Sequence, residues 1–278
     1  MHHVSPMSQN FNLEIESKET TMMEFGKYIY CIIDADKKVN FGLLGIGEDK
    51  PQVTTVNYKD IAAVVSTAPI KKYRVSRENS ITHEHVVEKV MEYYTVLPVR
   101  FGTVAKDEQL IQVLLEKRYL EFKKTLAEMK RKVELGVKVI WREEVIFEEI
   151  LSENEEIRTI RDEIMKSSLP PDQTHWQRAR VGEMVEAAMT RKREEEAGEV
   201  LRRLQPYCVD YRENRVLLDR MILNASFLVD ESQEADFDQQ VEALDKEQEH
   251  RLIIKYVGPV APHNFVDIVI NISELGLE

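Results

Sequence analysis

The spacing of apolar residues divides the first part of the chain into short strands and two helices. Runs of β-branched and aromatic residues, separated by turns rich in Gly, Pro and Asp, predict strands over residues 27–33, 41–46, 53–57 and 61–66. Apolar positions three and four residues apart predict a helix that begins near Asn79–Ser80 and a second helix, capped by Asp107, that runs through Leu126. Residues 95–104 between these helices are expected to be extended, with Pro98 on a sheet edge or at the start of a strand.

The second part opens on a predicted strand over residues 137–141 and continues with a helical hairpin. In the first helix, over 145–166, a seam for one partner helix is formed by Ile146, Ile150, Ile157, Ile160 and Ile164. The break at 167–171 separates it from a second helix, predicted from Asp172 to about Leu204. Within that helix, Arg191–Glu196 is polar on every side, so we expect this stretch to be solvated and to project from the body.

Two strands, a helix and a last strand follow, over residues 207–211, 220–229, 236–249 and 251–257. With the preceding strand and hairpin they form the order β-α-β-β-α-β, which is typical of a ferredoxin-like domain. The sequence therefore predicts an α+β protein of two domains. These are an N-terminal α+β domain (24–131) and a C-terminal ferredoxin-like domain (132–278), whose first helix is expanded into a long antiparallel hairpin at about 145–204. Residues 1–23 are expected to be a disordered leader, and residues 258–278 a tail that packs back on the body.

Charge is distributed unevenly along the chain, whose net charge is −12. Residues 24–131 carry 18 basic and 15 acidic side chains, whereas residues 132–278 carry 19 basic and 32 acidic ones. A nucleic-acid-binding protein would concentrate basic charge, so that class is disfavoured. Solubility is the simpler explanation of the acidic excess, and different partners for the two halves is the functional one. The longest apolar runs, such as 61–65 and 265–270, are far shorter than the roughly 18 residues of a membrane-spanning helix.

The residue patterns that catalysis or metal binding requires are missing from the sequence. His83 and His85 are two residues apart and point to different sides of a helix, so a zinc site there is disfavoured. The glycines of residues 42–47 are followed by Glu48–Pro51 rather than Gly-Lys-Ser/Thr, which favours a β-turn over a phosphate-binding loop.

The remaining candidates also have simpler explanations. Asp34 and Asp36 end a strand beside two lysines, which favours a solvated turn over a pair of catalytic carboxylates. Cys31 and Cys208 lie in apolar stretches and are expected to be small buried hydrophobic residues. We therefore expect no enzymatic activity, no cofactor and no metal ion.

Four stretches carry a resemblance that covers nearly the whole chain after residue 24. They are Tyr28-Ile29-Tyr30, the apolar run 61–66 ending in serine, residues 95–103 (Thr-Val-Leu-Pro-Val-Arg-Phe-Gly-Thr) and residues 255–266 (Lys-Tyr-Val-Gly-Pro-Val-Ala-Pro-His-Asn-Phe-Val). In this order and spacing they resemble the GvpF/GvpL family of gas vesicle proteins, with its Leu-Pro-x-Arg-Phe-Gly-Thr signature and its C-terminal Gly-Pro-x-x-Pro-x-Asn-Phe motif. The polar leader is a departure, and so is His263, which stands where an aromatic residue is common.

The resemblance implies a two-domain α+β protein without catalysis or cofactor, cytoplasmic and associated with gas vesicles. Its implied partners are the major gas vesicle shell protein (GvpA-type) and other gas vesicle accessory proteins. The role during vesicle assembly would be that of chaperone, nucleator or minor shell component. The alternative hypothesis, from a different class, is a small-ligand-binding sensor protein.

A shell protein exposes strand edges and apolar surfaces before it assembles, and a soluble binding protein could mask them. Our hypothesis places the protein-binding surface at Val99, Arg100, Phe101 and Thr103, where Arg100 would bind a carboxylate. The alternative left open is that Arg100 and Phe101 fix the join between the two domains. The hairpin is expected to reach another protein or a second copy of this chain, and its distal part, residues 155–193, is expected to be dispensable for folding.

Overall fold

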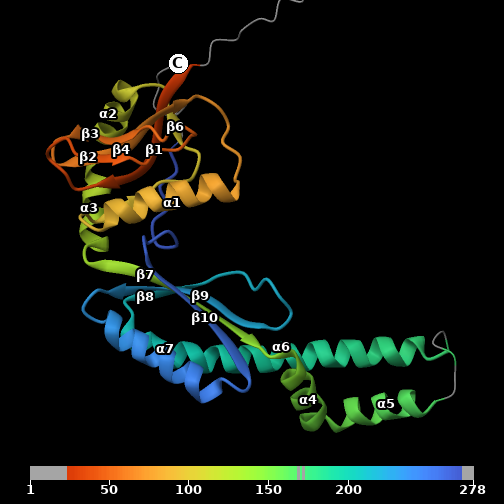
Figure 1. The fold of residues 1–278 in the computed structure, drawn as a ribbon. Helices are drawn as coiled ribbons and strands as arrows, with labels where there is room; N and C mark the ends of the chain where they lie inside the picture. Colours follow the sequence, from red (N-terminus) through yellow and green to blue (C-terminus); the bar gives the residue numbers. More distant parts are fainter. Residues whose placement is uncertain (1–23, 168–169, 171–172, 271–278) are drawn as a thin grey trace, which may run out of the picture.

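Two antiparallel sheets with helices packed on them make up the computed structural model, which describes residues 24–167, 170 and 173–270 (Figure 1). The first sheet has the strand order β2-β3-β4-β1-β5, and β6 pairs with β1. Its strands are β1 (Phe25–Ile33), β2 (Asn40–Leu43), β3 (Gln52–Tyr58), β4 (Ile61–Pro69), β5 (Val96–Pro98) and β6 (Val104–Ala105). The four strands predicted at the start of the chain are therefore present, although β2 ends before Ile46.

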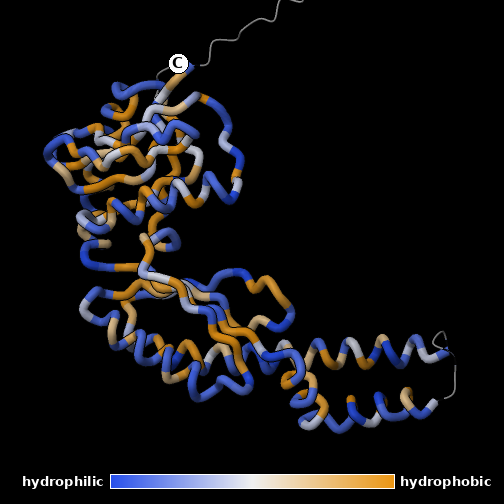
Figure 2. The backbone as a smooth tube through the Cα atoms, in the orientation of Figure 1, coloured by the Kyte–Doolittle hydropathy of each residue, from blue (hydrophilic) through white to orange (hydrophobic). Residues whose placement is uncertain are grey.

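The first sheet is buried on both faces, which explains why the apolar run in β1 is continuous. Tyr28 and Tyr30 pack on the side of helix α1, whereas Ile29 and Ile32 pack on the side of helices α2 and α3. These helices are α1 (Arg77–Met91), α2 (Glu108–Lys117) and α3 (Tyr119–Met129). Figure 2 shows hydrophobic residues concentrated in the strands of both sheets, with polar residues along the outer helices.

Helix boundaries in this half match the predictions in part. Asp107 caps α2, because its carboxylate accepts the backbone N–H of Leu110 at 2.8 Å. The cap of α1 is Ser76 rather than Asn79 or Ser80, since polar residues fill the first turn and hide it from an apolar pattern. The helix predicted from Asp107 through Leu126 is two helices, because the backbone at Arg118 leaves the helical region with φ −105° and ψ 17°.

The second sheet has the strand order β10-β7-β9-β8, and all its pairs are antiparallel. The strands are β7 (Lys132–Trp141), β8 (Asp210–Glu213), β9 (Met221–Asp230) and β10 (Leu252–Val260). Helix α7 (Glu234–Gln248) and the C-terminal half of α6 cover one face, where alternate strand residues such as Val137 and Phe227 form the core. A short turn of 3-10 helix, Gln205–Tyr207, follows α6.

The region predicted as a hairpin folds as α4 (Glu143–Glu153), α5 (Glu155–Lys166) and α6 (His175–Leu204). The single helix predicted over 145–166 is broken at Asn154, where the chain is extended and the side-chain amide donates to the Ile150 carbonyl at 2.7 Å. The predicted start of the second helix, Asp172, lies outside the described residues. Residues 155–166 and 175–187, called the arm below, extend away from both sheets (Figure 1).

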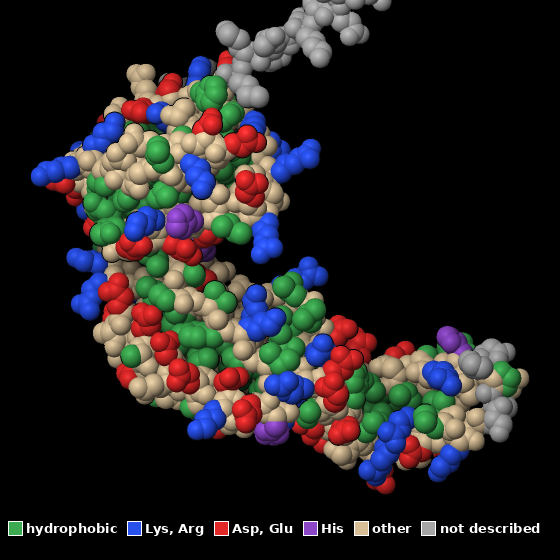
Figure 3. Space-filling model, viewed as in Figure 1, with side chains coloured by type: hydrophobic (Ala, Val, Ile, Leu, Met, Phe, Trp, Pro, Cys, Tyr) green, Lys and Arg blue, Asp and Glu red, His purple; other side chains and the backbone are tan. Residues whose placement is uncertain are grey.

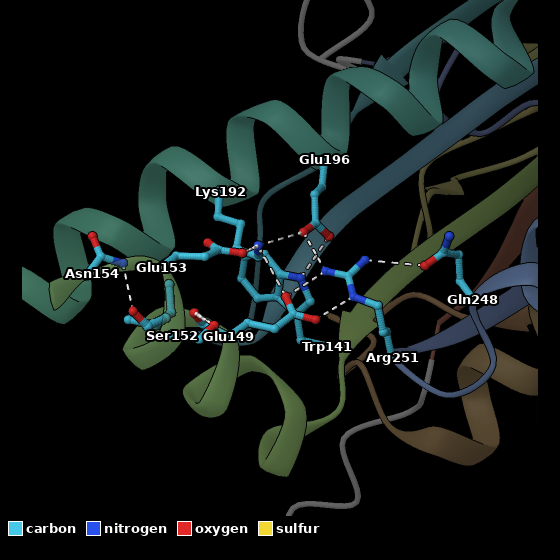
Figure 4. Close-up of polar contacts among 10 residues, drawn as sticks. Trp141, Glu149, Ser152, Glu153, Asn154, Lys192, Glu196, Gln248 and Arg251 are labelled. Atoms are coloured by element: carbon cyan, nitrogen blue, oxygen red, sulfur yellow. Dashed lines mark hydrogen bonds and ion pairs between the residues drawn. The ribbon is translucent and has the colours of Figure 1, made fainter. Parts of the chain in front are cut away.

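The prediction that Arg191–Glu196 projects from the body is wrong, and the prediction that it is solvated holds for Arg191, Glu194 and Glu195, which are exposed. Lys192 and Glu196 lie at the root of the arm, with side chains only 15% exposed, and they contact Glu149 and Arg251 (Figure 4). Arg251 binds both carboxylate oxygens of Glu149, at 2.6 and 2.8 Å, and Glu196 at 2.8 Å. The side of the stretch that faces the body is polar because Lys192 and Glu196 pair with Glu149 of α4 and with Arg251 at the start of β10.

The chain finally returns from the second sheet to the first. The C-terminal segment, here residues 261–270, packs Val266 and Ile268 into the core beneath α2 and α3. A parallel bridge between Val99 and Ile268 attaches it beside β5. In the part of the chain that the structure describes, no helix is long and apolar enough to cross a membrane.

Candidate functional site

Residues 99–103 form a loop between β5 and β6, and β1 holds this loop in place. The backbone N–H of Val99 donates to the Tyr30 carbonyl at 3.0 Å. At the turn, Gly102 has φ +83°, a left-handed conformation that favours glycine, and its N–H donates to the Tyr28 hydroxyl at 2.9 Å. Hydrogen bonds to the backbone and to a side chain of β1 therefore hold the signature loop on the first sheet.

Arg100 and Phe101 of this loop have opposite surroundings. Arg100 is exposed, and no hydrogen bond or ion pair to its guanidinium is found among the described residues. Phe101 is half-buried, with its ring edge-on to His83 at 5.6 Å between centroids. His83 is buried, and its Nδ1 lies 3.1 Å from the Tyr28 hydroxyl. Burial lowers the pKa of His83 to about 4, so its ring is neutral at pH 7 and belongs to the core.

Asn264 anchors the C-terminal motif to the second sheet. Its backbone N–H and side-chain amide donate to the two oxygens of the Glu134 carboxylate, at 2.8 and 2.5 Å, and the amide also reaches the Ser226 hydroxyl at 3.0 Å. Glu134 is 4% exposed and has no ion pair within the described residues. A buried carboxylate needs hydrogen-bond donors, and Asn264 supplies donors to Glu134 that strand β7 does not.

Gly258 begins the same motif, and no other residue fits its position. Its φ is +135°, outside the region that L side chains ordinarily adopt. An added Cβ would lie 2.9 Å from the Glu134 carbonyl oxygen, a backbone atom that cannot move aside. The peptide bond from Gly258 to Pro259 is cis.

His263 connects the motif to α1. Its Nε2 lies 3.0 Å from a Glu84 carboxylate oxygen, but the contact is not aligned as a hydrogen bond, so we treat it as an ion pair. Burial favours the neutral form of each group. The contact between them outweighs burial, so the pKa of His263 is raised and the pKa of Glu84 is lowered. A hollow of about 230 Å³ opens beside the pair, and its lining includes Arg100, Phe101 and Asp267.

The structure thus brings together the two most specific stretches of the sequence. Of the four predicted site residues, Arg100 is exposed, Phe101 and Thr103 are half-buried, and Val99 is 2% exposed beneath the C-terminal segment. Sequence reasoning missed Glu134, although a lone acid inside an apolar strand was the available signal. That these residues bind a partner stays a prediction.

The other candidate groups belong to the core or the surface. His83 is buried and His85 exposed, and no group of three His, Cys, Asp or Glu side chains that could hold a metal ion occurs in the described part of the chain. Burial raises the pKa of Cys31, and it raises that of the half-buried Cys208 to about 11. Both thiols are therefore protonated at neutral pH and are poor nucleophiles.

These features define an α+β protein of two antiparallel sheets, joined by its own C-terminal segment, with its most specific sequence at the joint. Residues 26–267 match the family model described as gas vesicle synthesis protein GvpL/GvpF, and the chain belongs to this family. Gas vesicle protein F of Microcystis aeruginosa is 29% identical over 250 residues, which cover 89% of this chain and 100% of the relative. The resemblance inferred from the four sequence stretches is confirmed.

Two solved structures have a similar fold. The crystal structure of gas vesicle protein GvpF from Anabaena sp. has a TM-score of 0.74 and 26% identity, and covers 88% of this chain and 99% of that one. The crystal structure of GvpF from Microcystis aeruginosa has a TM-score of 0.70 and 28% identity. It covers 87% of this chain and 99% of that one. The α+β class with antiparallel sheets is confirmed, and the comparisons support an accessory role in gas vesicles.

Proposed function

We propose that this protein is a non-enzymatic accessory factor that binds the major gas vesicle shell protein and other gas vesicle accessory proteins while the vesicle is assembled. It would act in the cytoplasm at gas vesicles, as a chaperone, nucleator or minor shell component. Family membership supports the vesicle role. The junction, which is the contact between loop 99–103 and the C-terminal segment 261–270, supports the proposed mode of action. There a loop held by β1 presents the Arg100 guanidinium, which has no partner among the described residues.

Arg100 is the best candidate contact of the junction. Its neighbours on both sides are fixed by the first sheet, so binding a partner through it would cost little ordering of the backbone. A guanidinium binds a carboxylate through two parallel hydrogen bonds, which would give the contact orientation as well as affinity. Val99 and Phe101 position this side chain rather than touch the partner.

The test is capture of the purified shell protein by the full chain, alongside Arg100→Glu and Arg191→Glu. Arg191 is an exposed arginine on α6, so its reversal makes the same charge change away from the junction. Capture by the wild type and Arg191→Glu, with loss for a folded Arg100→Glu, is the expected result. Equal capture by all three would exclude the junction as the contact, and no capture by any would contradict direct binding.

We infer further that the second half, from residue 132 on, is a ferredoxin-like domain with its first helix expanded into the hairpin. The order β-α-β-β-α-β and the strand order β10-β7-β9-β8 support this classification. The two-domain division at about residue 131 is part of the same proposal. We also propose that two copies of the chain associate through the arm. Analytical ultracentrifugation of the chain with and without the arm tests this.

The ligand-sensor alternative has less support. A larger hollow of about 830 Å³ borders the first sheet, but its lining mixes Lys71, Lys72 and Arg74 with Glu48 and Asp49. A small-molecule site is mostly apolar, with a few polar groups aimed at one point. Charges of both signs around an open hollow do not make such an arrangement.

A further inference from the structure

Strand β10 is a long, open edge of the second sheet. It spans nine residues, whereas the strands at the other sheet edges, β2, β5, β6 and β8, span four, three, two and four. Among the described residues its backbone pairs only with β7, so its outer N–H and C=O groups have no strand beside them. Proteins usually keep such edges short or covered, because an open edge accepts a further strand.

The side chains of β10 divide into two faces. Ile253, Lys255 and Val257 point to the face that carries no helix, opposite Ile140, Lys138 and Gly136 of β7. Val257 is 57% exposed and Ile253 is 36% exposed. Because Gly136 has no side chain, nothing on β7 covers Val257 from the inner side. An apolar surface is therefore left open at the sheet edge.

The other face of β10 borders an acidic helix. The hydroxyl of Tyr256 donates to the Asp238 carboxylate of α7, and its ring stacks on Phe237. Along α7 and its C-cap, acids recur at helical spacing on the side of Asp238: Glu234, Asp238, Glu242, Asp245 and Glu249. In the described ranges no Lys or Arg pairs with the carboxylate of any of these five, and Arg142 donates only to the backbone carbonyl of Glu249. Figure 3 shows hydrophobic side chains over β10 bordered by acidic ones over α7.

We propose that the outer edge of β10 is a docking site for an extended segment of another protein, which adds to the sheet as a further strand. Main-chain hydrogen bonds would supply affinity, and the two faces of β10 would supply specificity. On the helix face the added strand meets α7, so its residues there are Lys or Arg. On the open face it meets Ile253 and Val257, so its residues there are apolar, with an acid opposite Lys255.

A second copy of this chain is a poor occupant of the edge. Pairing β10 with β10 would place two acidic α7 helices side by side, each from a half with 19 basic and 32 acidic residues. Like charges at an interface are unfavourable, whereas a basic strand is complementary. The β10 edge is separate from Arg100, which lies at the junction. Failure of the peptide test at β10 and failure of shell-protein capture through Arg100 can therefore be told apart.

The probe is a synthetic peptide, Thr-Thr-Val-Lys-Glu-Lys-Val-Thr-Thr with blocked ends. In antiparallel pairing its valines face Val257 and Ile253, its lysines face the acidic side of α7, and its glutamate faces Lys255. Hydrogen–deuterium exchange of the full chain with and without peptide reports on the edge itself. We expect slower amide exchange within residues 252–257 on binding, and no slowing with a peptide whose central residue is proline, which lacks the N–H.

A matched pair of variants tests the charge argument. Glu242→Lys reverses one charge of the stripe, and we expect it to weaken peptide binding about five-fold at low salt, the size of one exposed charge pair. Asp236→Lys makes the same change on the opposite side of α7 and should leave binding unchanged. Val257→Glu tests the apolar face and should abolish the exchange protection.

Three outcomes would overturn the proposal. They are no protection of residues 252–257 at saturating peptide, equal effects of the two charge reversals, and binding that survives Val257→Glu. Dimerisation of the chain alone that Val257→Glu abolishes would instead assign the edge to a second copy.

Discussion

At the scale of single residues, the joint between the sheets depends on a buried acid and a remote amide. Asn264→Ala removes both side-chain hydrogen bonds at the joint and leaves the Glu134 carboxylate with one donor. An under-satisfied buried charge costs about 2–3 kcal/mol, so the free energy of unfolding in urea should fall by that amount. Asn214→Ala, which removes one bond to Ser226, is the control and should cost about 1 kcal/mol. Equal midpoints for wild type and Asn264→Ala would contradict the anchor.

The ion pair of His263 and Glu84 makes stability depend on pH in two directions. The pKa of His263 is raised from 6.5, so its contribution is complete below pH 6.5 and is lost as pH rises through the raised value. The pKa of Glu84 is lowered from 4.5, so its contribution is complete above pH 4.5 and is lost as pH falls through the lowered value. The pair is therefore strongest between about pH 4.5 and 6.5.

His263→Gln should remove the loss of stability that the wild type shows as pH rises above 6.5. The effect at pH 6 should stay below about 1 kcal/mol, because the pair is partly exposed. Thermal unfolding of both proteins from pH 5 to pH 9 measures this. His83 acts with the opposite sign, since its pKa is lowered to about 4 and stability should fall as pH drops below 6.5. Parallel curves for the two proteins above pH 6.5 would refute the role of His263.

At the scale of elements, the arm and its root differ in what they contribute. The arm contributes one buried side chain, Ile157, and the partly buried Val181, Met184 and Val185 to the core of the second half. Its root holds Lys192 and Glu196 in a network with Arg251. Replacing residues 156–186 by a short Gly-Ser turn removes these apolar contacts and should lower the free energy of unfolding by about 2 kcal/mol, the value of burying one large apolar side chain.

The longer deletion, residues 155–193, also removes Lys192 and leaves Glu149 with one cation fewer. It should destabilise the protein by about 3 kcal/mol more than the shorter one, because breaking a partly buried charge network leaves uncompensated charge. Circular dichroism in urea compares the two. The hypothesis that residues 155–193 are dispensable for folding is therefore restricted to residues 156–186, a range that leaves Lys192 in place. Equal stability of both deletions would show that the root network contributes nothing.

At the scale of the whole molecule, the C-terminal segment keeps the two sheets together. It contributes Val266 and Ile268 to the core of the first half and Asn264 to the second sheet. Deleting residues 261–278 should leave the strands of both sheets formed but expose the connection between α3 and β7 at residues 129–132. Limited trypsin digestion should cut there about ten-fold faster than in the wild type, because local opening becomes easier. Cleavage at the wild-type rate would mean that the sheets hold each other without the segment.

The sequence by itself determined most of the elements, because strands and helices here follow local spacing. The strands of β1, β3 and β4, the cap at Asp107 and the order of the second half are all visible as apolar periods and turn residues. The family was also visible, because its signature residues are needed locally: Gly102 and Gly258 occupy backbone conformations that other residues avoid.

Tertiary structure alone decided the pairing of polar residues, because pairing depends on partners that are remote in the chain. In the sequence Lys192 and Glu196 have the pattern of solvated residues, and only the fold places Glu149 and Arg251 beside them. In the sequence Glu134 has the pattern of a surface acid, and only the fold places Asn264, 130 positions later, beside it. The breaks at Arg118 and Asn154 were not predicted, because the apolar spacing continues across each of them. The spacing of apolar residues predicts which face of a helix or strand is buried, but only the tertiary structure determines which residues that face contacts.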